Sequence, residues 1–290
     1  MKIPRIEYNL PADIYRKSEG VSKSSLDTFA DCPAKFKAEQ DGIIRRESSP
    51  AMTFGTLLHA AVLDGKAEYA IKPDGMSFAS KEGKAWRAAQ DPNQVIVSQD
   101  EHDELIRTSS AILKHRHAAP LFGSGASEVS LWGKDVESGL IVKGRADWLG
   151  KGHIVDIKTT RAADNRSISR AIADYAYHRQ AALYLDIANH NGLDIGAFYF
   201  VFIERGDLPL INVRKIAVEA IDQGRIENGK LLRDLAECQR TGIWPDYSGT
   251  TEHPGEVDLP AWKYADMTGA EKIDLSDCEE TDENKNELIP

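Results

Sequence analysis

Two aspartates and a lysine lie around a glycine-rich turn, and their spacing could build a site for a divalent cation. Asp147 ends one segment, Asp156 follows nine residues later, and Lys158 lies two residues beyond. Side chains alternate along a β-strand, so Asp156 and Lys158 would share a face, and a hairpin turning at residues 149–152 would bring Asp147 beside Asp156. Carboxylate oxygens suit Mg²⁺ or Mn²⁺, and an ammonium can stabilise charge on phosphorus. The pattern predicts metal-dependent phosphodiester hydrolysis.

An exposed salt bridge between Asp156 and Lys158 is the structural alternative, because an Asp-x-Lys pattern also occurs in many unrelated chains. The neighbouring Ile154, Val155 and Ile157 are apolar, and two of them would point to the face opposite the aspartate. Charged groups are costly to bury unless they are paired or hold a metal. The apolar surroundings therefore favour a site with a chemical role.

A second polar set follows in a segment with a helical pattern. Tyr177, Gln180 and Tyr184 are spaced by three and four residues, so they would share one face of a helix. Gln180 could hydrogen-bond a carboxylate or a DNA phosphate, whereas the tyrosines, Tyr184 above all, could be core residues. Upstream, His59 lies within an apolar helical stripe, where a histidine alone is more often a packed core residue than a metal ligand.

The elements that must position these residues change type along the chain. Period-two patterns predict strands over residues 127–134, 139–148, 152–159, 196–204 and 210–218. Helical patterns predict helices over about 22–37 with a break at Cys32-Pro33, and over 51–65, 100–117, 165–191 and 221–240. Together they predict an α/β (α+β) fold, in which helices flank a central mixed β-sheet.

The domain organisation follows from the same patterns and from the charge. We expect an irregular segment over residues 1–20, one domain over 21–270, and an acidic tail without fixed structure over 271–290. The tail holds eight acidic and two basic residues, so it accounts for most of the net charge of -10. An acidic chain binds nucleic acid only where its basic residues are locally concentrated. Residues 66–100 combine basic residues with Phe78 and Trp86, and either a nucleic-acid contact or a plain surface segment would explain them.

The composition excludes several classes of protein. No apolar run is long enough to cross a bilayer, and the first residues show no secretory signal, so we expect a cytoplasmic protein without a membrane partner. The three cysteines, Cys32, Cys238 and Cys278, contain no CxxC pair. A disulfide framework and a closed zinc site are therefore not expected.

Five segments, in this order, resemble the PD-(D/E)XK nuclease superfamily and, within it, the exonuclease VIII (RecE-like) branch of phage or prophage recombination exonucleases. They are SKSSLDTFADCPAKF, FGTLLHAAVLD, GRADWL, VDIKTT and YAYHRQAALY, and the resemblance extends from about Val21 to Ser248. It implies a restriction-endonuclease-like core. Ala146 takes the place of the usual proline of the motif, and Asp156 takes the place of the usual glutamate.

The resemblance also implies a role for each site residue. Lys158, Asp156, Asp147 and Gln180 would be catalytic. The metal ligands would be Asp147, Asp156, His59, the backbone carbonyl of Ile157 and, as the acid that precedes the motif in many members, Glu128. Gln180 and Tyr184 match a Q-xxx-Y motif that holds the substrate strand, and Tyr177 would join them at the DNA.

The function that the resemblance implies is a Mg²⁺-dependent 5′-to-3′ exonuclease, with Mn²⁺ as a substitute cation. It would degrade linear double-stranded DNA from its ends and leave 3′ overhangs for a RecT-like single-strand annealing protein, working as a ring-shaped homo-oligomer. No iron–sulfur cluster is expected, because such members of the superfamily need three cysteines near the C-terminus and only Cys238 and Cys278 follow Cys32. Two alternatives stay open: a RecB-like nuclease of other polarity or single-strand preference, and a non-catalytic DNA-binding protein on a nuclease fold.

Overall fold

The structure is a computed structural model that describes residues 3–44, 50–92, 94–249 and 256–260. The chain divides into two compact units, residues 1–246 and 247–290, and the fold described below belongs to the first. The predicted acidic tail, residues 271–290, lies outside the described residues, as does Cys278.

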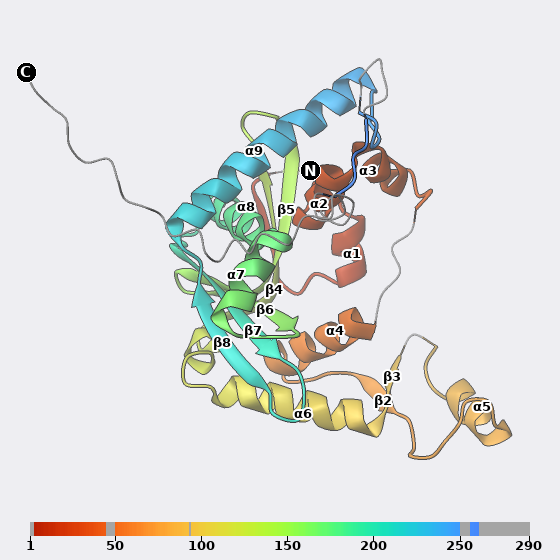
Figure 1. Ribbon diagram of the computed structural model, residues 1–290. Helices are drawn as coiled ribbons and strands as arrows, with labels where there is room; N and C mark the ends of the chain where they lie inside the picture. Colours follow the sequence, from red (N-terminus) through yellow and green to blue (C-terminus); the bar gives the residue numbers. More distant parts are fainter. Residues whose placement is uncertain (1–2, 45–49, 93, 250–255, 261–290) are drawn as a thin grey trace, which may run out of the picture. The chain divides into compact units, whose positions relative to one another are not determined.

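A six-stranded mixed β-sheet forms the centre of the first unit (Figure 1). The strand order is β1-β4-β5-β6-β7-β8; β6 and β7 run parallel, and the other neighbours are antiparallel. The strands are β1 (Arg5–Glu7), β4 (Gly125–Lys134), β5 (Ile141–Gly150), β6 (His153–Thr160), β7 (Ala197–Glu204) and β8 (Leu210–Lys215). This architecture confirms the predicted α+β fold with a central mixed sheet.

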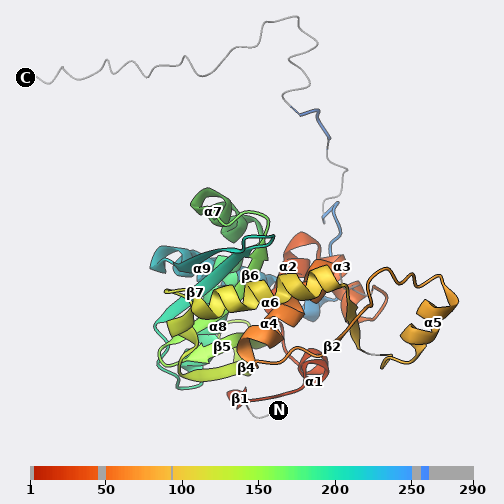
Figure 2. The same cartoon turned by 90° about the horizontal axis from the view of Figure 1, so that it is seen from below.

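Helices cover both faces of the sheet. On one face lie α2 (Lys23–Asp31), α3 (Pro33–Gln40), α7 (Asn165–Asp174), α8 (Tyr177–His190) and α9 (Val218–Thr241), and on the other lie α4 (Pro50–Leu63) and α6 (Gln99–Lys114). Figure 2 shows α6 lying across α4, and the two helices contact each other. Side chains of β7 alternate between the two cores: Phe200 and Phe202 point to the first, Val201 and Ile203 to the second. The sheet is therefore buried on both sides.

Strand β6 shows the predicted alternation. Ile154 lies in the core under α8, whereas Val155 and Ile157 lie in the core under α4 and α6. Asp156 and Lys158 consequently face the α8 side of the sheet. The local period-two pattern thus placed both charged residues on the correct face.

The remaining elements lie at the edges of the sheet or outside it. They are α1 (Ala12–Lys17), a short 3-10 helix (Ala119–Phe122), and a small parallel pair of strands, β2 (Tyr69–Ile71) and β3 (Val95–Val97). Along the chain, α5 (Lys81–Ala88) lies between these two strands. In the part of the chain that the structure describes, no helix is both long and apolar enough to span a membrane.

Several predicted boundaries differ from the structure, and three of these differences change the description of the fold. Residues 1–20 were expected to be irregular, but they contain β1, which pairs with β4, and α1. The helix predicted over 165–191 is two helices, α7 and α8, because Ala176 adopts a left-handed conformation (φ +49°) that an α-helix cannot contain. The last helix begins at Val218, where the preceding strand was expected to end. Left-handed alanine has no strong sequence signal, which explains the missed break.

Candidate active site

The hairpin of β5 and β6 is regular near its turn and opens at the two aspartates. The strands pair at three positions, Trp148 with Val155, Leu149 with Ile154, and Gly150 with His153. In the same register Asp147 would face Asp156, but its carboxylate Oδ2 instead accepts a hydrogen bond of 2.8 Å from the backbone N–H of Ile157. A side chain therefore takes the place of a ladder hydrogen bond, and the gap between the strands admits groups from neighbouring elements.

The other edge of β5 is also irregular at Asp147. The ladder with β4 pairs Ser127 with Trp148 and Val129 with Ala146, which leaves Glu128 opposite Asp147. Glu128 has a left-handed backbone (φ +51°), a costly conformation for a residue other than glycine. Its carboxylate forms an ion pair with Arg145. The distortion of β4 turns Glu128 toward Asp147.

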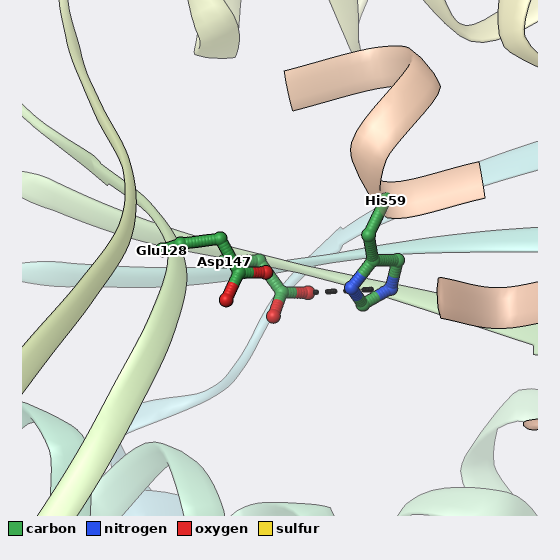
Figure 3. Close-up of side chains that lie close together, drawn as sticks. All are labelled: His59, Glu128 and Asp147. Carbon is green, nitrogen blue, oxygen red and sulfur yellow. Dashed lines mark ion pairs between the residues drawn. The ribbon is translucent and has the colours of Figure 1, made fainter. Parts of the chain in front are cut away.

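His59 completes a group of candidate metal ligands with these two acids. Ligand atoms of His59, Glu128 and Asp147 all lie within 4.8 Å of one another (Figure 3). His59 extends from α4, and its Nε2 lies 3.6 Å from Asp147 Oδ2 and 3.1 Å from the carbonyl oxygen of Ile157. Two carboxylates, an imidazole and a backbone carbonyl suit Mg²⁺ or Mn²⁺ better than a soft, thiolate-bound metal.

Asp156 lies beside this group and binds two side chains. One of its oxygens is 2.6 Å from Lys158 Nζ, and the other accepts a hydrogen bond from the amide of Gln180. Asp156 and Gln180 are buried. The ammonium of Lys158 also lies 4.9 Å from the centre of the Tyr177 ring, which adds a cation–π contact. Asp156 and Tyr177 together fix the position of the lysine.

The charges of the site act on one another strongly because the groups are buried. Burial and the nearby Asp156 carboxylate raise the pKa of Asp147 to about 7. For Lys158, burial by itself lowers the ammonium pKa, but the carboxylates of Asp156 and Asp147 outweigh it and raise the pKa above its usual value. Lys158 is therefore a cation at neutral pH.

A groove of about 1050 Å³ opens from the two aspartates, and we call it the aspartate groove. It is lined by residues of the hairpin and of α8: Asp147, Asp156, Lys158, Tyr177, Gln180 and Tyr184. Tyr184 is also a core residue: its ring packs against Phe198 and over Gly144, where an added Cβ would lie 2.7 Å from the ring. Both interpretations of Tyr184 therefore apply.

Sequence reasoning missed two basic residues near the site. Lys23 lies 2.7 Å from Asp27, donates to the Tyr175 carbonyl at 2.5 Å, and lies 5.5 Å from the Tyr177 ring centre. Arg145 pairs with Glu128. Arg145 is two residues before Asp147, within the GRADWL segment, so strand alternation could have identified it. Lys23 had no such signal, because its position depends on how α2 packs.

The described residues of the basic and aromatic segment, 66–92 and 94–100, do not line the aspartate groove. Phe78 and Trp86 stack on each other with a 6.3 Å ring separation, and Lys72 and Arg87 lie over the Phe78 ring. Its aromatic residues thus contact their own neighbours.

Comparison with known proteins gives a family and a fold. Residues 22–254 match the family described as "PDDEXK-like domain of unknown function (DUF3799)". The crystal structure of a protein named "Putative exonuclease" from Eubacterium rectale superposes with a TM-score of 0.63 at 15% sequence identity, over 91% of this chain and 99% of that one. A crystal structure of SSO0001 reaches a TM-score of only 0.34 at 14% identity, over 81% of this chain and 80% of that one. No curated protein matches the chain.

Proposed function

The chain belongs to the family of PDDEXK-like domains of unknown function, and we propose that it is a metal-dependent exonuclease that acts on linear double-stranded DNA. Membership confirms the resemblance to the PD-(D/E)XK superfamily; the RecE-like branch stays a prediction. One observation carries the proposal. The ligand atoms of His59, Glu128 and Asp147 converge within 4.8 Å, next to a lysine held by Asp156. This is an arrangement for phosphodiester hydrolysis rather than for simple DNA binding.

The residues present fit a hard divalent cation. His59, Glu128, Asp147 and the Ile157 carbonyl would hold it, and the raised pKa of Asp147 reflects carboxylates that a cation would stabilise. Such a cation supplies Lewis acidity, which polarises a phosphodiester and lowers the pKa of water.

The chain's own groups have distinct roles in this proposal. Lys158 places a fixed positive charge where negative charge develops on the phosphate. Asp156 orients that lysine, and Gln180 holds Asp156 through its amide. Tyr177 and Tyr184 form the wall of the aspartate groove along which the substrate strand would lie.

The finer parts of the proposal rest on the resemblance of five sequence segments to the RecE-like branch. We propose that the cation is Mg²⁺, that digestion runs 5′ to 3′, and that it leaves 3′ overhangs for a RecT-like annealing protein. A ring-shaped homo-oligomer would keep an acidic protein on its DNA by enclosure. The name of the Eubacterium rectale neighbour agrees with an exonuclease but belongs to that protein alone.

The test is digestion of linear duplex DNA with Mg²⁺, with each end blocked in turn, and with closed circular DNA as the control. We expect loss of the strand with a free 5′ end, no digestion of circles, and digestion slowed at least about 10²-fold in Asp156→Asn or Lys158→Ala chains that remain folded. Undiminished digestion by both variants would refute the site. Cleavage of circular DNA would refute the exonuclease assignment and leave an endonuclease.

A further inference from the structure

A second groove, of about 1250 Å³, meets the aspartate groove at Lys158 and Tyr177. It lies between the end of β6, α7 and the residues after β7. We call it the arginine groove after Arg161, Arg170 and Arg205, which line it. Lys158 and Tyr177 line both grooves, whereas Asp147 and Asp156 line only the aspartate groove. A strand in the arginine groove would thus reach the site without meeting its acids.

The arginine groove is basic within an acidic protein. Four basic residues and two acidic ones, Glu104 and Asp174, line it. Glu104 is neutralised by Arg205, which donates two hydrogen bonds to it, of 2.9 and 2.6 Å. Arg161 and Arg170 are exposed and form no ion pair or side-chain hydrogen bond within the described part of the chain. Two uncommitted guanidinium groups in one groove suit the phosphates of a nucleic acid.

An exposed aromatic ring lies where the two grooves meet. Tyr175 lines the arginine groove, is 62% exposed, and has its ring centre 5.6 Å from that of Tyr177. The left-handed backbone of Ala176 sets the angle between α7 and α8, and Lys23 holds the Tyr175 carbonyl at 2.5 Å. The ring is therefore exposed although its backbone is fixed. Such a ring can stack on an unpaired base, whereas the bases of a duplex are already stacked on each other.

We propose that the arginine groove binds single-stranded DNA that is not being hydrolysed, with phosphates on Arg161 and Arg170 and a base on Tyr175. This inference rests on the proposed function, because the bound strand is the one that remains after digestion. Asp147 and Asp156 line the aspartate groove and do not line this one, so a strand lying in the arginine groove is kept away from these carboxylates. The two grooves would then hold the two strands of an opened DNA end.

Fluorescence anisotropy of a labelled oligothymidine of about 15 nucleotides, titrated with the full chain in EDTA, tests the proposal without hydrolysis. For Arg161→Gln/Arg170→Gln we expect at least about tenfold weaker binding at 0.1 M salt. The slope of log affinity against log salt should fall by about 1.4, since each single-strand phosphate contact contributes about 0.7. Tyr175→Ala should weaken binding about tenfold with the slope unchanged, because stacking involves no counterion.

Arg166→Gln is the matched control, since Arg166 is an exposed arginine of α7 that does not line the groove. It should bind like the wild type. An unchanged slope in the double variant, or the same loss in Arg166→Gln, would overturn the inference. If the double variant lost as much affinity for a blunt duplex as for the oligonucleotide, the groove would be assigned to duplex DNA, and this result would also overturn the inference.

Digestion assays on the same proteins separate this inference from the proposed function. A wild-type chain that digests DNA but does not bind the oligonucleotide would refute the groove and leave the exonuclease standing. Binding with the expected pattern by a chain that digests nothing would refute the exonuclease and support the groove as a single-strand site.

Discussion

Asp156 uses its two carboxylate oxygens for two different partners, Lys158 and Gln180. The group of ligand atoms within 4.8 Å instead consists of His59, Glu128 and Asp147. His59, Glu128 and Asp147 thus form a side that suits a cation, and Asp156 belongs to the side that holds the lysine. A role of Asp156 as a metal ligand stays a prediction. At this scale the chemistry depends on distances of a few ångströms, so single substitutions are informative.

Replacement of Lys158 by alanine should lower kcat by about 10² to 10³, the usual effect of removing one group that stabilises transition-state charge. The substitution also leaves Asp156 without its cation. Lys151→Ala, at an exposed lysine in the turn of the same hairpin, is the control and should have little effect. Steady-state digestion rates at saturating DNA would measure kcat for both variants. Similar rates for the two variants would contradict the role of Lys158.

The buried carboxyl group of Asp147 should make the stability of the metal-free chain depend on pH. The pKa of Asp147 is about 7 in the folded chain and near 3.8 when exposed. A raised folded pKa contributes stability that is present below the unfolded pKa and is lost as pH rises through the folded one. The free energy of unfolding in EDTA should therefore fall between about pH 4 and about pH 7. In Asp147→Asn this fall should be smaller.

Chemical denaturation of both proteins in EDTA, at about pH 5 and about pH 8, measures this difference. Relative to the wild type, metal-free Asp147→Asn should gain stability as the pH rises from about 5 to about 8, although it loses a metal ligand. Parallel pH dependence in the two proteins would show that Asp147 does not titrate in this range.

At the scale of elements, the site depends on β5 packing closely against α8. Gly144 of β5 lies under the Tyr184 ring, and an added Cβ there would approach ring carbons at 2.7 Å. The two strands β5 and β6 open at Asp147, and α4 places His59 into that opening from the opposite face of the sheet. Helices on both faces of the sheet thus reach one site.

Gly144→Ala should lower the free energy of unfolding by about 1–3 kcal/mol, because the new methyl group overpacks a core that cannot easily shift. Digestion should also slow, since Tyr184 and Gln180 belong to the same helix. Gly196→Ala is the control: nothing lies within 4 Å of a Cβ at that position, and its φ is not positive. Urea denaturation of the two variants gives the comparison. Equal stability would mean that β5 and α8 are less closely packed than described.

At the scale of the whole molecule, residues far apart in the chain assemble the site. His59 and Ile157 are 98 residues apart, and Gln180 and Asp156 are 24 apart. A cation that binds only the folded chain shifts the folding equilibrium toward the folded state. Metal binding and folding should therefore be coupled.

Mn²⁺ or Mg²⁺ at about 100 times its dissociation constant should stabilise the folded chain by about 2.7 kcal/mol relative to EDTA. Thermal unfolding should show this as a higher Tm, and removal of the metal should abolish digestion. The shift should shrink in His59→Ala and Glu128→Ala chains. His190→Ala, at an exposed histidine near the end of α8, should keep it. A full shift in both ligand variants would mean that the cation binds elsewhere.

The sequence by itself determined the local structure of this protein: which residues form strands and helices, and which side chains share a face. Period-two alternation is a property of the chain, so it predicted the β5–β6 hairpin, the shared face of Asp156 and Lys158, and the opposite face of Val155 and Ile157. Helical spacing likewise predicted that Tyr177, Gln180 and Tyr184 share one face of a helix, and in the structure all three line the aspartate groove. The mixed sheet followed from the order of these elements.

Only the tertiary structure decided which distant groups meet. The gap at Asp147, the left-handed backbones of Glu128 and Ala176, and the position of Lys23 depend on how helices pack against the sheet. Such contacts follow from the shapes of whole faces, which no spacing of a few residues encodes. The arginine groove is of the same kind. It exists because the chain turns sharply between α7 and α8, where the sequence pattern predicted one continuous helix.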